Sequence, residues 1–483
     1  MSSQGGALTQ LIALGAADRY LTQNANITYW RHRYNRYTNF AMEPIEQQFN
    51  TSVGFGQETQ ITLNRTGDLI FYTYVVARIP GIIGRRSDAQ PTRIFPSTLP
   101  SEACNSCGDL NDVMAAPSCV PDEMVQSGYA HYTNAIGQWL VQRASITIGG
   151  QVIDTLYADY LYMWEELSGK PGKRLEEMIG KEYSVPDLVR ASSMTRRLYI
   201  PLPFWFSSPN ASGNALPVVS LQFHGIQMQV RFAELQTCIQ TSCHNVPTMQ
   251  NGTLVPAERP YVHVYQNSPD GVGAAIENSS LQASIETTYI FLDIEERDRF
   301  ATGSFEQLIT QVQYYQQTTS GTQDIRINLN FNHPVIELIW AVRRECLRKA
   351  NSNFEYYGYG GTDPIDKVSL KLNNLPRFQE RDGRYFRLVQ PWQYHTNIPS
   401  TFIYVYSFAL YPEEPQPSGS CNFSRIDNID LEFKLNRASG GKALSAVHCN
   451  PALDTTEVQV IVFARNYNIL RLREGLGGLA FSN

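Results

Sequence analysis

Polar and apolar residues alternate along much of this chain. In residues 227–232 and 430–435 every second side chain is apolar, so each segment has one apolar face and one polar face. This period of two is typical of half-buried antiparallel strands. Residues 69–77 and 401–410 are instead rich in β-branched and aromatic residues, which is typical of strands in a sandwich core. The pattern therefore predicts an all-β protein.

The predicted strands fall into two sets, with boundaries defined to within a few residues. The first set is expected at 43–52, 57–65, 69–78, 140–148, 196–206, 216–223, 226–234 and 283–294. The second set is expected at 305–316, 324–331, 335–343, 366–373, 385–391, 402–410, 424–435 and 456–466. A helical pattern is limited to 156–166 and, more weakly, 173–179, so short helices are expected in the connections.

The two sets repeat one pattern of residues. Three pairs of segments match in the same order along the chain: 40–47 with 300–307, 144–148 with 368–372, and 199–232 with 404–435. One such match could arise by chance, but three in order favour two copies of one β unit that differ in loop length.

Eight antiparallel strands in two facing sheets are the jelly-roll count. We therefore predict two consecutive eight-stranded antiparallel jelly rolls, joined by the charged connector 293–300. Two long insertions, 80–137 and 235–282, interrupt the first copy. In a jelly roll both of these connections emerge at the same end, so we expect the insertions to lie together.

Composition indicates a protein that associates with partners. Only 17% of residues are charged, while Tyr (27) and Phe (22) are abundant. A sparsely charged, aromatic surface suits burial against other subunits, although aromatic core strands explain the same numbers. The net charge of −6 argues against direct nucleic-acid binding. Residues 1–39 nevertheless contain four Arg and one acid, 4 − 1 = +3, which fits either ordinary surface charge or an arm that faces an acidic partner or lipid head groups.

The sequence contains neither a recognisable targeting signal nor a long apolar run. Residues 1–15 lack a basic start, and Thr9 and Gln10 interrupt their apolar stretch. The apolar run 69–84 is broken by Arg78. We therefore expect synthesis in the cytosol, where the eight cysteines should be mostly reduced.

Catalytic motifs are missing from the sequence. It contains no GxxxxGK[ST], HExxH, GxSxG or GxGxxG pattern, and 54–56 (GFG) is expected to be a turn or bulge. Isolated histidines are expected to be structural rather than metal ligands, in contrast to the paired histidines of cupin enzymes; they are His131, His224, His263, His333 and His395. Adjacent acids are expected to diverge rather than act as an acid/base couple, at 165–166, 176–177 and 295–296. We predict no catalytic residue, no cofactor and no metal ligand.

The cysteines of the two insertions leave three alternatives open. Cys104, Cys107 and Cys119 lie in the first insertion, and Cys238 and Cys243 lie in the second, followed by His244. These residues are free thiols, ligands of a structural zinc ion, or partners in a disulfide formed after release. Of seven N-x-[ST] sequons, Asn210, Asn251 and Asn278 are where sugars would lie if any are added, although chance occurrence explains the set.

Several stretches resemble the major capsid proteins of phycodnaviruses and related large eukaryotic DNA viruses. At the start of the chain these are 6–11 (GALTQL), 20–22 (YLT), 27–30 (ITYW), 34–40 (YNRYTNF) and 52–56 (SVGFG). Further along they are 289–300 (YIFLDIEERDRF), 416–428 (QPSGSCNFSRIDN), 464–471 (ARNYNILR) and 475–480 (GLGGLA). The resemblance spans both halves of the chain and both of its ends, but it does not extend to the two insertions.

The resemblance implies a structural protein of the virion rather than an enzyme. It implies a homotrimer whose six barrels give a pseudo-hexagonal capsomer, which tiles an icosahedral shell over an internal membrane. Expected partners are neighbouring trimers, minor capsid and penton proteins, and the internal membrane through the N-terminal arm. The insertions would occupy the outer, host-facing end.

The expected domain division follows from the strand sets and the resemblance. It consists of an N-terminal arm at 1–26, a first jelly roll at 27–297, a linker at 298–304, a second jelly roll at 305–469, and a strand-free C-terminal tail at 470–483. Two rival functions share this fold: a glycan-binding spike or fibre, and a cupin-type enzyme.

Overall fold

The structure is a computed structural model of the 483-residue chain. It describes residues 5–25, 27–30, 36–84, 130–173, 175–207, 212–241, 248–250, 253–255, 274–276, 281–319, 324–349, 351–358, 362–436 and 457–481. The chain forms two compact units, residues 1–41 and residues 42–483, and each is described by itself.

The N-terminal unit contains two short helices, α1 (Gly5–Ile12) and α2 (Ala16–Thr22). The Asp18 carboxylate accepts a hydrogen bond from the Gly15 N–H at 2.9 Å and so satisfies a free donor at the start of α2. Neither helix buries any of its residues.

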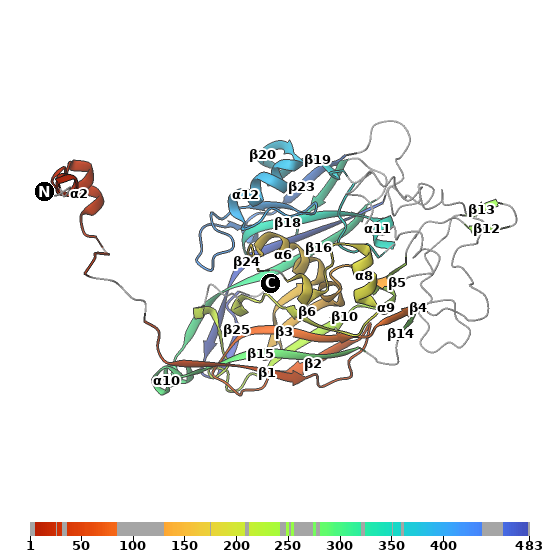
Figure 1. Ribbon diagram of the computed structural model, residues 1–483, viewed down its shortest axis with the longest axis horizontal. Helices are drawn as coiled ribbons and strands as arrows, with labels where there is room; N and C mark the ends of the chain where they lie inside the picture. The colour runs from red at the N-terminus through yellow and green to blue at the C-terminus, as the bar shows by residue number, and fades with distance from the viewer. Residues whose placement is uncertain are drawn as a thin grey trace. The chain divides into compact units, whose positions relative to one another are not determined.

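The first half of the larger unit is built from two antiparallel sheets (Figure 1). The first large sheet has the order β1 (Phe40–Gln48), β15 (Gln282–Leu292), β3 (Leu69–Ile79), β8 (Arg196–Pro201), with β9 (Leu216–Pro217) beside β3. The first small sheet has the order β2 (Glu58–Thr62), β10 (Ile226–Phe232), β6 (Val141–Ile148), β7 (Gln151–Tyr157).

The second half repeats this arrangement. The second large sheet has the order β16 (Phe305–Thr319), β24 (Val458–Arg473), β18 (Pro334–Arg344), β21 (Tyr404–Ser407), with β22 (Cys421–Asn422) beside β18 and β25 (Leu476–Leu479) beside β24. The second small sheet has the order β17 (Asp324–Asn328), β23 (Ile429–Leu435), β19 (Ile365–Leu372), β20 (Leu375–Asp382).

The two halves share one strand order. When the principal strands of each half are numbered along the chain, both large sheets read 1-8-3-6 and both small sheets read 2-7-4-5. The internal repeat predicted from the residues is therefore confirmed at the level of topology.

The remaining elements are short and lie in the connections. The helices are α5 (Ile136–Leu140), α6 (Ala158–Ser168), α7 (Glu176–Ile179), α8 (Val185–Ser192), α9 (Leu235–Cys238), α10 (Ile294–Thr302), α11 (Glu345–Lys349), α12 (Gln390–Tyr394), the 3-10 turns η1 (Trp205–Ser207), η2 (Ser212–Asn214) and η5 (Phe423–Arg425), and the π-helix η4 (Tyr385–Val389). In the described part of the chain, no helix has the length and apolar character needed to cross a membrane.

The start of each insertion lies beside the end of the other, as expected for connections at one end of a jelly roll. Strand β4 (Ile82–Gly84) pairs with β14 (Ala274–Ile276), and β5 (Ala130–Tyr132) pairs with β11 (Ile239–Thr241). A small hairpin within the second insertion pairs β12 (Thr248–Gln250) with β13 (Thr253–Val255). The two long connections therefore emerge at the same end of the first half.

The second large sheet is buried on both faces, whereas a jelly-roll sheet usually buries one. Leu338, Trp340 and Val462 lie in the core of the second half. Their neighbours in the same strands, Ile339 and Phe463, lie on the opposite face and belong to the core of the first half. Because successive side chains of a strand point to opposite faces, one sheet serves two cores.

Several predicted elements were wrong. The expected strand 385–391 is the π-helix η4 followed by α12, where only Phe386, Gln390 and Pro391 are buried. The expected strand 216–223 is reduced to the two residues of β9. Strands β7 and β20 were not predicted: the expected helix 156–166 overlaps only the end of β7, and β20 is almost wholly exposed. The strand-free tail at 470–483 was also wrong, since β24 continues to Arg473 and β25 follows.

Candidate functional site at the junction between the two halves

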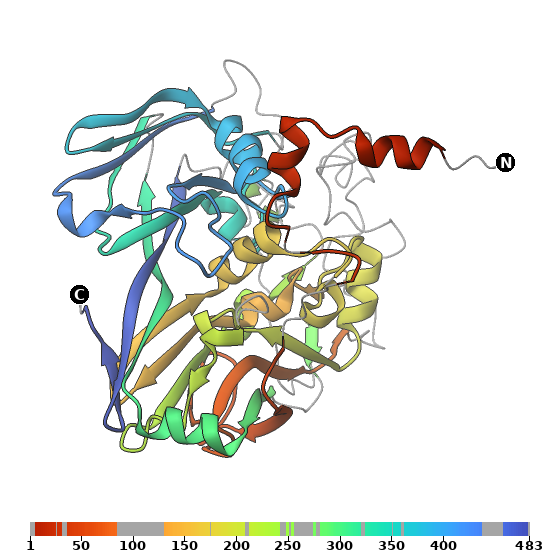
Figure 2. The ribbon, with the colours of Figure 1, turned by 90° about the vertical axis from the view of Figure 1, so that its left-hand side faces the viewer.

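Helix α6 of the first half lies between the strands of the two halves (Figures 1 and 2). It follows β7 directly, and its buried residues include Tyr160, Leu161 and Met163. The sequence places polar groups at intervals on this otherwise apolar helix. These polar groups make the contacts with the second half.

The start of α6 is anchored by a buried ion pair. The Asp159 carboxylate lies 3.2 Å from Arg343 Nη1 and accepts a hydrogen bond from the Tyr356 hydroxyl at 2.7 Å. The Arg343 guanidinium also donates to Gln459 Oε1 from two of its nitrogens, at 3.0 and 2.6 Å. Its charge is therefore compensated, as a buried guanidinium requires.

The middle of α6 contacts a second buried cation. Arg465 lies over the Trp164 ring, with the guanidinium carbon 3.9 Å from the ring centroid. Its Nη1 also lies 2.6 Å from Glu337 Oε1. Cation–π contacts of this kind gain strength when they are shielded from water. The apolar helix face is therefore joined to a charge in β24.

His395 completes this cluster. Its side chain is fully buried, with Nε2 2.9 Å from Glu337 and Nδ1 3.0 Å from Glu413. Burial alone would lower the pKa of His395, but the two carboxylates raise it to about 9. Burial would raise the pKa of Glu337, but His395 and Arg465 lower it to about 2. The cluster is therefore charged and compensated at neutral pH.

The end of α6 is held by the chain that follows His395. Asn397 N–H donates to the Leu167 carbonyl at 2.9 Å, and the Ser400 hydroxyl donates to Glu166 at 2.8 Å. Lys181 lies 2.6 Å from the other oxygen of Glu166. Burial would raise the pKa of Glu166, but Lys181 and Ser400 lower it.

Strand β7 of the first half also contacts strand β16 of the second half. The Val312 N–H of β16 donates to Asp154 Oδ1 of β7 at 3.0 Å, and Gln311 donates to the Ile153 carbonyl. The rings of Tyr157 and Tyr314 stack with centroids 4.4 Å apart. Burial raises the pKa of Asp154 to about 7, even though two backbone N–H groups and Arg465 act in the opposite direction.

Asn351 and the C-terminal hairpin complete the junction. The Asn351 side chain donates to the carbonyls of Gln236 and Ile239, both at 2.7 Å, from a left-handed backbone (φ 59°) that Asn tolerates well. In β25, Gly477 N–H lies 3.2 Å from His224 Nδ1, and Leu479 N–H donates to Gln151 at 3.1 Å. Segments separated by more than 100 residues are thus fixed to one another.

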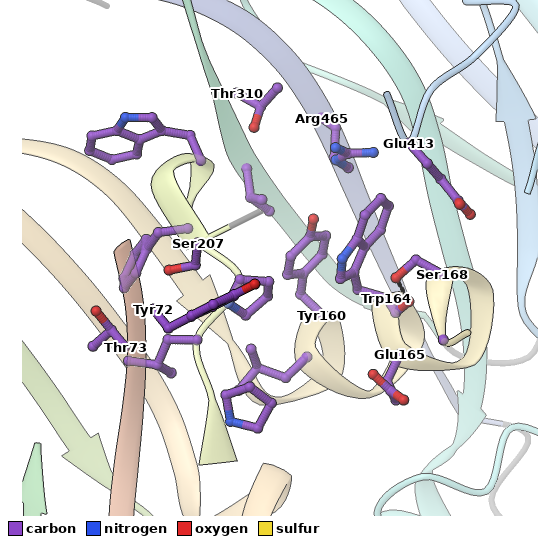
Figure 3. Close-up of a pocket in the computed structure, with 18 of the residues that line it drawn as sticks. Tyr72, Thr73, Tyr160, Trp164, Glu165, Ser168, Ser207, Thr310, Glu413 and Arg465 are labelled. Atoms are coloured by element: carbon purple, nitrogen blue, oxygen red, sulfur yellow. Dashed lines mark hydrogen bonds between the residues drawn. The ribbon is translucent and has the colours of Figure 1, made fainter. Parts of the chain in front are cut away.

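A cavity of about 470 Å³ opens at this junction (Figure 3). Tyr72 and Ser207 of the first half line one side, and Trp164, Arg465 and Glu413 line the other. Burial and the adjacent Glu166 raise the pKa of Glu165 to about 7, and its side chain points away from Arg465 in Figure 3. Among the described residues, no three His, Cys, Asp or Glu side chains are grouped closely enough to hold a metal ion.

In the described ranges, the histidines and cysteines singled out from the sequence have separate partners. His131 Nδ1 lies 2.8 Å from the Tyr132 carbonyl, the backbone N–H of His333 donates to Ser424, and His395 has the carboxylate partners given above. Cys238 is a free thiol in the core, and its burial raises the pKa of the thiol to about 12. His263, Cys104, Cys107, Cys119, Cys243, His244, Asn210, Asn251 and Asn278 lie outside the described residues.

Sequence reasoning missed the charged residues of the junction. A signal was available, because Glu337 interrupts the apolar run 335–342 and Arg465 follows the apolar run 460–464. A charge inside such a run is costly unless it meets a partner on the facing surface. The partners themselves could not be identified, since they lie in distant parts of the chain.

Two joined halves with one strand order define a viral double jelly roll of the capsid-protein type. A capsid chain in a quasi-atomic model of the PBCV-1 virus capsid has 28% sequence identity and a TM-score of 0.67, with 94% of this chain and 100% of that chain covered. The Faustovirus major capsid protein shares the fold, with a TM-score of 0.64 at 14% identity, over 96% of each chain.

Sequence comparison identifies the family. The protein-family model described as "Major capsid protein N-terminus" matches residues 28–91 and 104–293. A second family model, described as "Large eukaryotic DNA virus major capsid protein", matches residues 296–478. The major capsid protein of Pyramimonas orientalis virus is 33% identical over 506 residues, with 99% of this chain and 100% of that protein covered. The chain belongs to the major capsid proteins of large eukaryotic DNA viruses, which are structural proteins of the virion.

Proposed function

We propose that three copies of this chain form a pseudo-hexagonal capsomer that tiles the icosahedral shell of a large double-stranded DNA virus. The supporting observation is the repeated strand order of the two halves, which gives a trimer six similar units. A threefold ring needs an interface that closes on itself, and an obligate interface of this kind buries more than about 2,000 Å². The role is mechanical, without catalysis, cofactor or metal.

Rigidity between the halves supports this proposal. A tile keeps its outline only if its two barrels do not move relative to each other, and Arg343 and Arg465 hold α6 of the first half against the second large sheet. We propose that each half is an eight-stranded jelly roll, with the division 1–26, 27–297, 298–304, 305–469 and 470–483. In this division α10 (Ile294–Thr302) contains most of the linker.

The proposed partners are the neighbouring copies in the shell, minor capsid and penton proteins, and the internal virion membrane through the N-terminal arm. Direct contact with nucleic acid is not part of the proposal. We place the paired insertions 80–137 and 235–282 on the outer, host-facing end. Contacts between trimers can be weak, because a shell repeats them many times.

Solution mass tests the proposal. Light scattering on the purified protein should give a stable species near three times 54.5 kDa, with a six-sided outline in negative-stain images. A monomer that binds sugars would contradict the capsomer and favour the spike or fibre alternative. Deletion of residues 1–20 should leave the trimer intact, because residues 1–41 form a separate compact unit, and should block shell assembly, because the arm would contact the partners beneath the shell. Loss of the trimer on this deletion would show that the arm belongs to the subunit interface.

A further inference from the structure

The N-terminal arm, extended here from residues 1–26 to residues 1–39, exposes most of the large apolar side chains that the structure describes in it. Leu11 is 71% exposed, Ile12 is 79% exposed and Trp30 is 86% exposed. Both of its helices lack buried residues. Within this unit the apolar side chains are not buried against one another, and an apolar surface of this kind indicates a binding site.

The apolar residues of the arm lie at helical spacing. Leu8, Leu11 and Ile12 are three and four positions apart in α1, and Ala17, Tyr20 and Leu21 have the same spacing in α2. Each helix is about two turns long, which is too short to be stable alone in water. Helices of this length become stable when their apolar face is buried against another surface.

The charge of the arm restricts the nature of that surface. Residues 1–39 have a net charge of +3 while the whole chain has −6, so residues 40–483 have −6 − 3 = −9. The one acid of the arm, Asp18, is engaged by the Gly15 N–H. The exposed aromatic residues Tyr20, Tyr29, Trp30 and Tyr37 accompany the arginines. Helix α2 contains Arg19 and Tyr20, whereas Trp30 and Arg36 follow it in the chain. Short apolar helices flanked by arginine, Trp and Tyr suit the head-group region of a bilayer.

We propose that the arm binds the surface of an anionic lipid bilayer, with α1 and α2 lying in the plane of the interface. This inference rests on the proposed capsomer, since it specifies one of the partners of its arm. Two short helices have a small apolar area, so one arm binds weakly and reversibly. Three arms on one trimer bind the same membrane together and raise the apparent affinity.

Sedimentation with sucrose-loaded vesicles tests the proposal on the full-length protein. The trimer should co-sediment with vesicles of phosphatidylcholine that contain roughly 30% phosphatidylserine, and it should bind vesicles of phosphatidylcholine alone more weakly. Raising the salt from about 0.05 M to 0.5 M should release much of the bound protein, because it screens the arginines.

Substitutions in the arm separate the apolar and the charged contributions. The double variant Leu11→Ser/Ile12→Ser should weaken binding by about 100-fold or more, because two apolar side chains lose their burial. Arg19→Gln/Arg36→Gln should weaken it by about 25-fold, at roughly fivefold per arginine near an anionic surface. The matched control Ile294→Ser/Leu375→Ser changes two side chains outside the arm that are 74% and 72% exposed, and it should bind like the wild type.

The outcomes distinguish the inference from the proposed function. Wild-type binding that is lost in the arm variants and kept in the control supports the lipid partner. A trimer that ignores anionic vesicles, or one whose binding is unchanged by both arm variants, overturns it. If the arm variants block shell assembly while the wild-type trimer does not bind vesicles, the partner is a protein. Vesicle binding by a chain that is not trimeric would contradict the capsomer and leave the lipid inference standing.

Discussion

The two large sheets share one strand order but differ in what they bury. In the second large sheet, Glu337, Arg343, Arg344 and Arg465 are buried charged residues. In the first large sheet, the buried polar residues of the described strands are Gln47, Thr73, Ser284 and Thr287, all uncharged. The second large sheet thus contains buried charges that the described strands of the first large sheet lack.

The position of these charges explains the difference. The charged residues Glu337, Arg343 and Arg465 share one face of the sheet with the apolar residues Ile339, Ala341 and Phe463. This face contacts the first half. The opposite face keeps an apolar core of its own. Both halves share the inward apolar pattern that specifies the jelly roll. The outward face of the second large sheet forms the junction, where partnered charges favour a single arrangement of the halves.

The two small sheets also differ in the charges on the faces that point away from their cores. Across the second small sheet, Arg326 pairs with Asp430 and Glu432, Lys371 pairs with Glu432, and Glu380 lies between Lys367 and Lys434. Two corresponding rows of the first small sheet are neutral: Thr62, Gln227 and Thr147, then Gln60, Gln229 and Ser145. Its next row retains an ion pair, between Arg143 and Glu58 at 2.7 Å. Cross-strand neighbours that point away from the core can therefore be ionic or neutral on one backbone.

The largest effect is expected from Glu337→Gln, which removes the carboxylate shared by Arg465 and His395. Two buried cations would lose a partner, so the free energy of unfolding should fall by about 3–5 kcal/mol. Urea unfolding of the trimer measures this change. The first-half control is Thr73→Val in β3, because the buried Thr73 hydroxyl has no partner among the described residues. It should be neutral or slightly stabilising, and equal losses in both variants would contradict the comparison.

A pH titration should isolate the contribution of His395. The pKa of His395 is raised from 6.5 to about 9 in the folded chain, so its stabilising contribution is complete below pH 6.5 and is lost as the pH rises through 9. The loss corresponds to roughly 3 kcal/mol. His395→Gln should abolish this slope in urea unfolding measured from pH 6 to 10. His224→Gln, in the first half, should keep it.

Asp154→Asn should stabilise the protein at pH 8. The pKa of Asp154 is raised from 3.8 to about 7 in the folded chain, so its contribution decreases as the pH rises from 4 to 7. The amide keeps an oxygen for the Val312 N–H and carries no buried charge. We expect a gain of roughly 2 kcal/mol at pH 8 and none near pH 4. A loss of stability at pH 8 would mean that the charge of Asp154 is compensated in the trimer.

The smallest effect is expected from Glu432→Gln in the second small sheet. Exposed ion pairs contribute little and are screened by salt. The unfolding midpoint should shift slightly at low salt and not at all in about 1 M NaCl, where the Debye length is roughly 3 Å. Gln229→Ala, in the matching row of the first small sheet, should show no salt-dependent shift. A large, salt-resistant effect of Glu432→Gln would indicate that this face is covered in the assembled shell.

Alternation predicted strands best where one face is buried. The C-terminal ends of β10 and β23 were expected at 234 and 435 and lie at Phe232 and Leu435. The alternation is clear in these strands because Met228 and Leu431 face a core while their neighbours face outward. Residue pattern gave the wrong element at 385–391, where aromatic and β-branched residues indicate a strand. The segment is helical, and Phe386 packs against Trp340. It also failed at β20, whose exposed residues have no apolar face to reveal it.

By itself, the sequence determined the all-β class, the duplication and the family, because these depend on local alternation and on residues that recur in order. Only the tertiary structure decided the junction: that Asp159 meets Arg343, that Arg465 lies over Trp164, and that His395 is enclosed by two carboxylates. The reason is physical. Local pattern specifies which face of a strand turns inward, whereas a buried charge is stabilised by whichever partner the folded chain brings to it, however distant that partner is in the sequence.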